Sequence, residues 1–123
     1  MFFVVSSGRS GSTTAAETFS QYANCICPHE PEPRLICEAT DYYYGRNPED
    51  EIAKILRESR RPTVDGKIYG EANQKLCFMV PLLARLFPES KFVWVLRDGR
   101  DVVASMFSRG WYESPARTPL LEI

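Results

Sequence analysis

The chain has 123 residues, which is long enough for one domain with a hydrophobic core and too short for two. Its 15 basic and 16 acidic residues nearly cancel, so the charge balance does not indicate a nucleic acid or a membrane surface as a partner. No run of about eighteen apolar residues and no signal-peptide core occurs. We therefore expect no transmembrane segment, no nucleic-acid partner and a cytoplasmic location.

The first predicted element is a buried strand over residues 2–5, a continuous apolar run of the kind found in parallel sheets. From Ser12 onward, apolar residues recur at helical spacing through Phe19, so a helix is expected to follow the intervening loop at once. Residues 24–27 predict a short second strand that Pro28 halts.

The middle of the chain begins with an irregular segment. Residues 28–34 alternate proline with other residues, which excludes regular structure there. Residues 47–59 predict a helix, with Asn47 as its cap and Pro48 at its first position. Residues 67–70 predict the end of a strand.

The last predicted elements give the fold class. Residues 74–87 show helical periodicity with a kink expected at Pro81, and residues 91–96 form a second apolar run that predicts a buried strand. Asp98 is the expected cap of a further helix. The alternation of strands and helices predicts an α/β protein with a parallel sheet and helices on its faces.

The four cysteines are expected to be reduced thiols, because the chain is not cysteine-dense and nothing in it suggests secretion. Cys25, Cys27 and His29 have a spacing that metal ligands use, but alternation on a short strand explains it equally well. A second Cys/His pair at zinc-site spacing is absent from the sequence. We predict no metal site.

The segment SSGRSGSTT (residues 6–14) lies between the first strand and the first helix, where parallel sheets bind ligands. The first N–H groups of a helix lack internal partners, and Gly8 and Gly11 allow the backbone to approach an anion closely. Arg9 adds a positive charge with several donors. Further donors are expected from Ser10, Ser12, Thr13 and Thr14. A simple helix cap with a flexible Gly-Ser turn is the alternative, but it does not account for an arginine between two glycines.

This segment is not a standard Walker A motif, G-x-x-x-x-G-K-[ST]. Ser6 stands at the position of the first glycine, and Ser12 stands at the position of the lysine that reaches the β- and γ-phosphates. We therefore expect a phosphate-binding loop that differs from those of ordinary ATP and GTP enzymes.

A second candidate phosphate site follows the strand at residues 91–96. Arg97 lies at the carboxyl end of that strand, and Ser105 lies about two turns into the next helix. Together these two side chains can hold a phosphate separate from the first one. The alternative is that Arg97 pairs with Asp98 or Asp101 and that Ser105 only packs.

The two motifs together resemble those of the sulfotransferases that use 3′-phosphoadenosine-5′-phosphosulfate (PAPS). Members of that family have a loop like [K/R]-[ST]-G-[ST]-T after the first strand and a later stretch like R-D-P-R-D-x-x-x-S. This chain has RSGST at residues 9–13 and RDGRDVVAS at residues 97–105, and the preceding LFPESKFVWVL is also similar to the family. The resemblance extends over nearly the whole chain.

The resemblance implies a role for each matching residue. Arg9 would neutralise charge on the 5′-phosphate as the sulfuryl group leaves, while Arg97 and Ser105 would bind the 3′-phosphate. The other residues implied to bind the 5′-phosphosulfate are Ser10, Gly11, Ser12, Thr13 and Thr14. PAPS would be the co-substrate, and no metal is implied.

The sequence departs from the family pattern in two ways. Gly99 replaces the usual proline, and family members continue past the second motif with further helices and a late basic loop that closes over the nucleotide. The resemblance thus implies one nucleotide-binding domain over residues 1–123, truncated at its carboxyl end. Its fold would be an incomplete sulfotransferase fold: a three-layer, P-loop-type parallel sheet with helices on both faces.

Sulfuryl transfer needs a general base for the acceptor hydroxyl or amine, and the family uses a histidine or a glutamate. Glu30 is the first candidate, because it follows the predicted second strand where many members carry their glutamate. His29 is the second candidate and Glu71 is a weaker third. The aromatic residues Tyr42–Tyr44 and Trp111–Tyr112 either line an acceptor site or are ordinary partly buried side chains.

Two alternatives remain open at this stage. The first alternative to a sulfotransferase is a noncatalytic remnant that binds a nucleotide or a partner chain. The other alternative is a P-loop kinase with an atypical loop, which the missing lysine at position 12 and the lack of a recognisable Mg²⁺-binding Asp disfavour.

Overall fold

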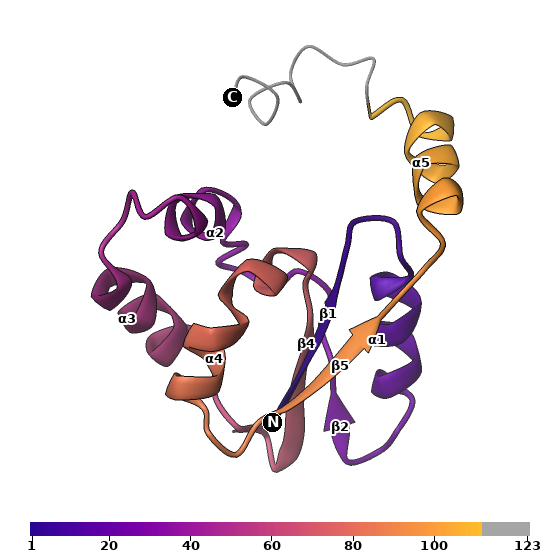
Figure 1. The fold of residues 1–123 in the computed structure, drawn as a ribbon. Coiled ribbons are helices and arrows are strands. Elements are labelled where there is room, and N and C mark those ends of the chain that lie inside the picture. Colours follow the sequence, from indigo (N-terminus) through magenta and orange to yellow (C-terminus); the bar gives the residue numbers. More distant parts are fainter. Residues whose placement is uncertain (112–123) are drawn as a thin grey trace.

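The computed structural model describes residues 1–111 and contains a mostly parallel sheet flanked by helices (Figure 1). The sheet order is β2-β4-β1-β5, and these neighbours are all parallel. The short strand β3 pairs antiparallel with β4. The strands are β1 (Phe2–Ser6), β2 (Cys25–Ile26), β3 (Thr63–Val64), β4 (Lys67–Ala72) and β5 (Lys91–Val95).

Helices cover both faces of the sheet, which confirms the predicted α/β class with a parallel sheet (Figure 1). The helix α1 lies on one face, and α2, α3 and α4 lie on the other (Figure 1). The helices are α1 (Ser12–Ser20), α2 (Ile36–Tyr43), α3 (Glu49–Ser59), the 3₁₀ helix η1 (Gln74–Met79), α4 (Val80–Leu86) and α5 (Gly99–Ser108).

Alternate residues of β1 serve the two hydrophobic cores, because successive side chains of a strand point to opposite faces. Phe3 and Val5 pack into the larger core beneath α2, α3 and α4. Val4 packs into the smaller core with Ala16 of α1 and Cys27. All five residues are buried, so β1 is the central strand that its apolar sequence predicts.

The prediction for β5 is wrong in one respect. Its strand is present, but among the described residues it pairs only with β1 and lies at an edge of the sheet. Trp94 is 72% exposed, and Leu96, just after the strand, is 75% exposed. An apolar run shows that a strand is suited to burial, but it does not show which elements cover it.

The predicted helix over residues 47–59 is present, but its cap differs. Pro48 is itself the N-cap and the helix begins at Glu49, so Asn47 is not the capping residue. The segment 74–87 is not one kinked helix either: it is 3₁₀ through Met79, and α4 then starts with Pro81 in its first turn. This is the position where proline costs least, because the first N–H groups of a helix have no partner. The cap at Asp98 is confirmed, since its side chain accepts a hydrogen bond from the backbone N–H of Arg100 (2.8 Å).

The helix α2 is absent from the sequence prediction. Its N-cap, Leu35, has a left-handed backbone (φ 58°) and makes no side-chain capping bond, so no start signal is visible. The helix is held by tertiary packing instead, through the buried residues Leu35 and Ala39.

The buried thiol of Cys27 predicts a loss of stability in alkaline solution. Burial raises the pKa of Cys27 to about 12, with smaller effects from Cys25 and Glu71. Because a thiol in the unfolded chain titrates near about 8.5, the unfolded state releases its proton first, and the free energy of unfolding falls as the pH rises above that value. For Cys27 alone we expect a fall of up to about 1.4 kcal/mol per pH unit between about pH 9 and about pH 10, measured by urea unfolding in reductant.

The variant Cys27→Ala should show a shallower slope, and the exposed-site control Cys37→Ala should keep the slope of the parent protein. An unchanged slope in Cys27→Ala would contradict this assignment.

Candidate functional site

The loop between β1 and α1 turns sharply before the helix begins. Arg9 and Gly11 both have positive φ angles, 63° and 103°, and Gly11 is the N-cap of α1 without a side-chain capping bond. A Cβ atom at Gly11 would meet no heavy atom within 4 Å, so the space beside this turn is open. The helix start is thus accessible to a ligand, and its N–H groups and dipole favour a negative charge.

The second motif lies directly against this loop. The Nε of Arg9 donates to the Oγ of Ser105 (3.2 Å), and the Nη1 of Arg97 donates to the carbonyl oxygen of Arg9 (3.0 Å). The Arg9 guanidinium also lies 5.9 Å from the ring centroid of Trp111. Parallel β1 and β5 are neighbours, so their carboxyl ends bring the two segments together although nearly ninety residues or more separate them in the sequence.

Arg97 does not form the alternative ion pair with Asp98. Asp98 caps α5 and is paired with Arg100, whose Nη2 lies 2.7 Å from Oδ2. This pairing lowers the pKa of Asp98 through the hydrogen bonds from the Arg100 side chain and backbone. The guanidinium of Arg97 donates to the Arg9 carbonyl in the loop between β1 and α1 instead.

His29 contacts the first turn of α1. Its Nε2 lies 3.0 Å from the Oγ of Ser12 and 3.4 Å from the Oγ1 of Thr13. Backbone hydrogen bonds hold the segment around His29 beside β4, since Glu30 N–H donates to Ala72 O and Ala72 N–H donates to Pro28 O, both at 3.0 Å. His29 therefore lies at the first turn of α1 without belonging to it.

The other members of the predicted loop differ in exposure. Ser10 and Ser12 are buried, whereas Thr13 and Thr14 are exposed. The Oγ atoms of Ser7 and Ser10 contact each other. The hydroxyls of Ser10 and Ser12 thus have partners within the protein, and the exposed threonines remain the more accessible donors.

Glu30 forms an ion pair that the sequence did not suggest. Its Oε1 lies 3.1 Å from the Nζ of Lys75, and both side chains are largely buried. Lys75 also lines the cavity described below, so this ion pair lies at the edge of that cavity.

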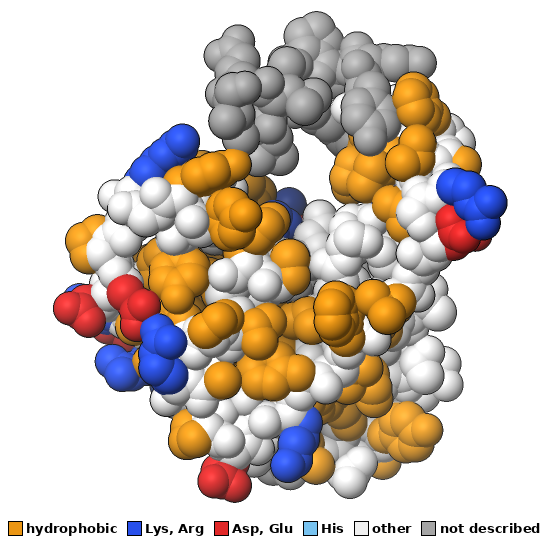
Figure 2. Space-filling model, viewed as in Figure 1, with side chains coloured by type: hydrophobic (Ala, Val, Ile, Leu, Met, Phe, Trp, Pro, Cys, Tyr) orange, Lys and Arg blue, Asp and Glu red, His pale blue; other side chains and the backbone are white. Residues whose placement is uncertain are grey.

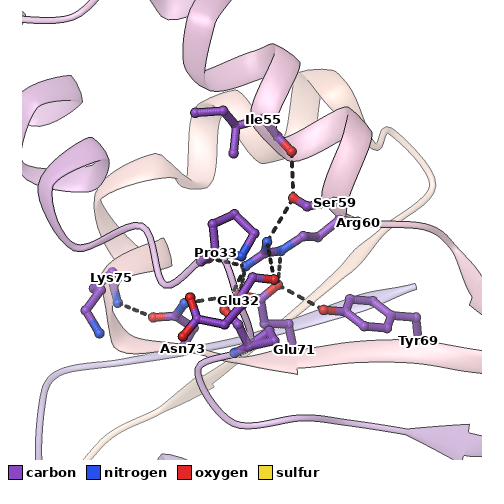
Figure 3. Close-up of polar contacts among 10 residues, drawn as sticks. Glu32, Pro33, Ile55, Ser59, Arg60, Tyr69, Glu71, Asn73 and Lys75 are labelled. Atoms are coloured by element: carbon purple, nitrogen blue, oxygen red, sulfur yellow. Dashed lines mark hydrogen bonds and ion pairs between the residues drawn. The ribbon is translucent and has the colours of Figure 1, made fainter.

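Glu71, the third candidate base, is withdrawn from any ligand. It is fully buried and paired with Arg60, which donates from Nε to Oε2 (2.7 Å) and from Nη2 to Oε1 (2.9 Å). Tyr69 and Asn73 donate to the same carboxylate (Figure 3). Because it is fully buried and its oxygens accept from three side chains, Glu71 is a structural group.

The pair also affects its neighbours electrostatically. Burial would lower the pKa of Arg60, but the hydrogen bond and the charge of Glu71 outweigh it and raise the pKa. Burial, reinforced by the Glu71 charge, likewise raises the pKa of Tyr69. Arg60 therefore stays charged and Tyr69 stays neutral across the physiological range.

A cavity of about 650 Å³ opens beside the loop between β1 and α1. Most of its wall is apolar, and Figure 2 shows hydrophobic side chains over α2 and across the centre of the same face. Its lining residues include Ser6 and Gly8 at the loop, Ile36, Tyr43 and Tyr44 of the α2 region, Phe78 of η1, and Trp111. Tyr112, the partner of Trp111 in the sequence prediction, lies outside the described residues.

Ser6 supplies an unused polar atom at this place. Its Oγ is buried and has no hydrogen-bond partner within the described residues, and Ser6 lines the cavity beside the loop. A buried hydroxyl without a partner is costly, and a ligand with an acceptor or donor group would satisfy it.

Sequence reasoning missed Arg60, Asn73 and Lys75. Arg60 follows a helix that ends in mixed charges, where an exposed arginine is the ordinary expectation. Asn73 and Lys75 follow β4, and the carboxyl end of a parallel strand was the one signal that pointed to them.

Within residues 1–111, no group of three His, Cys, Asp or Glu side chains has a metal-binding arrangement. No helix of this described part is long and apolar enough to cross a membrane. No family model and no curated protein sequence matches this chain, so we interpret the site from its own geometry.

The geometry of the loop predicts that Gly11→Ala weakens anion binding. A side chain at φ 103° is strained, at a cost of about 1 kcal/mol or more, and relief of the strain would move the N–H groups at the helix start. We expect the affinity for inorganic pyrophosphate, measured by calorimetry, to fall about tenfold or more, since a charged hydrogen bond contributes about 1.5–3 kcal/mol.

The matched control is Gly45→Ala. Gly45 also has a positive φ (65°) and open space around it, but it lies after α2 and outside the loop. It should lose stability and keep its pyrophosphate affinity. Equal affinities for both variants would show that the Gly11 turn does not bind anions.

Proposed function

We propose that this protein binds PAPS and transfers its sulfuryl group to an acceptor hydroxyl or amine. The observation that carries the proposal is the meeting of the two sequence motifs: Arg9 donates to Ser105, and Arg97 donates to the backbone of Arg9. Two arginines, an open helix start and two hydroxyl-bearing segments then surround one place. A nucleotide with phosphates at both its 5′ and 3′ positions matches that arrangement.

The proposed binding mode assigns one phosphate to each motif. The start of α1, with Gly11, Thr13 and Thr14, donates to the 5′-phosphosulfate, while Arg97 and Ser105 bind the 3′-phosphate. Arg9 lies between the motifs, so it can neutralise the charge that develops on the leaving 5′-phosphate.

The transfer itself is an in-line displacement at sulfur. The acceptor oxygen or nitrogen forms a bond to sulfur while the bond from sulfur to the 5′-phosphate oxygen breaks, and its electron pair remains on the phosphate. The acceptor proton passes to a general base. The products are a sulfated acceptor and 3′,5′-adenosine bisphosphate.

The contacts of the two candidate bases favour different roles. Glu30 lies beside Lys75, which lines the cavity, and this supports Glu30 as the base for an acceptor held there. His29 lies against Ser12 and Thr13 of the phosphate loop, which supports a role for its imidazole at the phosphosulfate.

The cavity supports an apolar, aromatic acceptor over a sugar. Its volume of about 650 Å³ suits a small molecule, and its wall carries Ile36, Tyr43, Phe78 and Trp111. A phenol can place its ring against these side chains and its hydroxyl toward the loop, whereas a sugar would leave most of its hydroxyls without partners.

The proposed role of Arg97 at the 3′-phosphate can be tested by substitution. Arg97→Ala should weaken the binding of 3′,5′-adenosine bisphosphate, measured by titration calorimetry, by about tenfold or more, because it removes a charged hydrogen-bond donor. Arg100→Ala is the matched control, since Arg100 belongs to the same motif but pairs with Asp98 and is well exposed. Equal weakening by both variants would argue for a general charge effect instead of a 3′-phosphate site.

The second prediction concerns the acceptor. Phe78→Ser should weaken the binding of simple phenols, measured by ligand-observed NMR, by about threefold to tenfold, because it removes an aromatic wall. Ile68→Ser is a control of similar exposure, 45% against 44%, at a residue of β4 that does not line the cavity. Tighter binding of monosaccharides than of phenols would overturn the proposed acceptor class.

A further inference from the structure

Arg60 occupies an unusual position for a charged residue. It directly follows α3, and its side chain is fully buried together with that of Glu71. The two form a bidentate pair in which both carboxylate oxygens accept from the guanidinium (Figure 3). Burial of such a pair requires that the remaining donors also find partners.

The other donors of Arg60 reach Ser59, whose Oγ accepts from Nη1 (2.8 Å), and the segment that follows Glu30. Nη2 donates to the carbonyl of Pro33 (3.0 Å) and lies 3.5 Å from that of Pro31, and Nη1 lies 3.4 Å from that of Glu32. Pro31 and Pro33 have no N–H groups, so this segment cannot be held by an ordinary strand ladder. One guanidinium therefore holds three consecutive carbonyl groups.

A second path runs from Glu71 back to Glu30. The Nδ2 of Asn73 donates to Glu71 Oε1 (3.1 Å), and the Oδ1 of Asn73 accepts from the backbone N–H of Lys75 (3.0 Å; Figure 3). Lys75 in turn pairs with the carboxylate of Glu30 at 3.1 Å. The same buried pair is thus linked to both ends of the Glu30–Pro33 segment.

We propose that the Arg60–Glu71 pair is a positioning device that fixes the His29–Pro33 segment against the phosphate loop. Arg60 and Glu71 touch no substrate in this proposal. They act through the backbone of residues 31–33 and through Asn73 and Lys75. That this positioning serves catalysis rests on the proposed function. That the pair holds the segment in place is a property of the fold and is tested separately.

The pair can be replaced without leaving a buried charge. A double variant, Arg60→Met with Glu71→Leu, removes both charges and supplies apolar side chains, which in other proteins often preserves or raises stability. It cannot replace the hydrogen bonds to the three carbonyl groups. If the pair only stabilises the fold, the His29–Pro33 segment should be undisturbed in this variant. If the pair positions the segment, the segment should lose its fixed contacts.

The measurement uses His29, which is the only histidine of the chain. The imidazole signals in a ¹H–¹³C NMR spectrum therefore belong to His29. Cross-relaxation from the imidazole to Ser12 and Thr13 reports its contact with the start of α1. Hydrogen exchange of the Glu30 amide, which donates to Ala72 O, reports the backbone.

In the double variant we expect the cross-relaxation to disappear and the Glu30 amide to exchange about tenfold faster or more, relative to its own core amides. Leu83→Ala is the control, because it destabilises the core without touching the segment. It should leave the His29 signals in place. Arg60→Lys keeps the charge but loses the planar fork of donors, so we expect an intermediate effect even if the double variant fails to fold.

Unchanged His29 signals and Glu30 exchange in both the double variant and Arg60→Lys would overturn the positioning role. If the double variant does not fold, unchanged signals and exchange in Arg60→Lys would overturn it. Binding of 3′,5′-adenosine bisphosphate to the parent protein is measured in parallel. If the variants release the segment but the parent protein binds no nucleotide, the positioning role stands and the proposed function is rejected. If the parent protein binds the nucleotide but the variants do not release the segment, the proposed function stands and the positioning role is rejected.

Discussion

The buried pair of Arg60 and Glu71 links three separate parts of residues 1–111. It joins the end of α3, the central part of the sheet at β4 and the proline-containing segment that approaches the start of α1. Loss of one partner would leave an uncompensated buried charge, at a cost of about 3–5 kcal/mol. That is a large part of the roughly 5–15 kcal/mol by which domains of this kind are stable. The pair is therefore a constraint that the fold cannot relax cheaply.

The site depends on a second constraint, which is the parallel pairing of β1 and β5. In this arrangement the carboxyl ends of the two strands lie side by side, so the segments that follow them meet. Arg9 and Ser105 are brought within 3.2 Å of each other in this way. An antiparallel pairing of the same two strands would place these segments at opposite ends of the sheet. The topology thus makes one site from two short motifs.

The sequence was informative where local chemistry decides the structure. The apolar run of β1, the cap at Asp98 and the loop before α1 all follow from residue types at fixed spacing. It was uninformative where packing decides: Leu35 begins α2 in a left-handed conformation without a capping bond, and Arg60 resembles any surface arginine at a helix end. The Lys75–Glu30 pair was also hidden, because its two residues are far apart in the sequence and are brought together by backbone hydrogen bonds of residues 28–30 to Ala72. Long-range pairs of charges carry no periodic signal.

The proposed function requires that this site recognise two separate phosphates of one nucleotide. The most direct test is titration calorimetry of the parent protein with 3′,5′-adenosine bisphosphate and, in parallel, with adenosine 5′-monophosphate, which differs only by the 3′-phosphate. We predict that the bisphosphate binds about tenfold tighter or more, because Arg97 and Ser105 supply charged and neutral hydrogen bonds to the additional phosphate. Equal affinities, or tighter binding of ATP with Mg²⁺ than of the bisphosphate, would contradict the account.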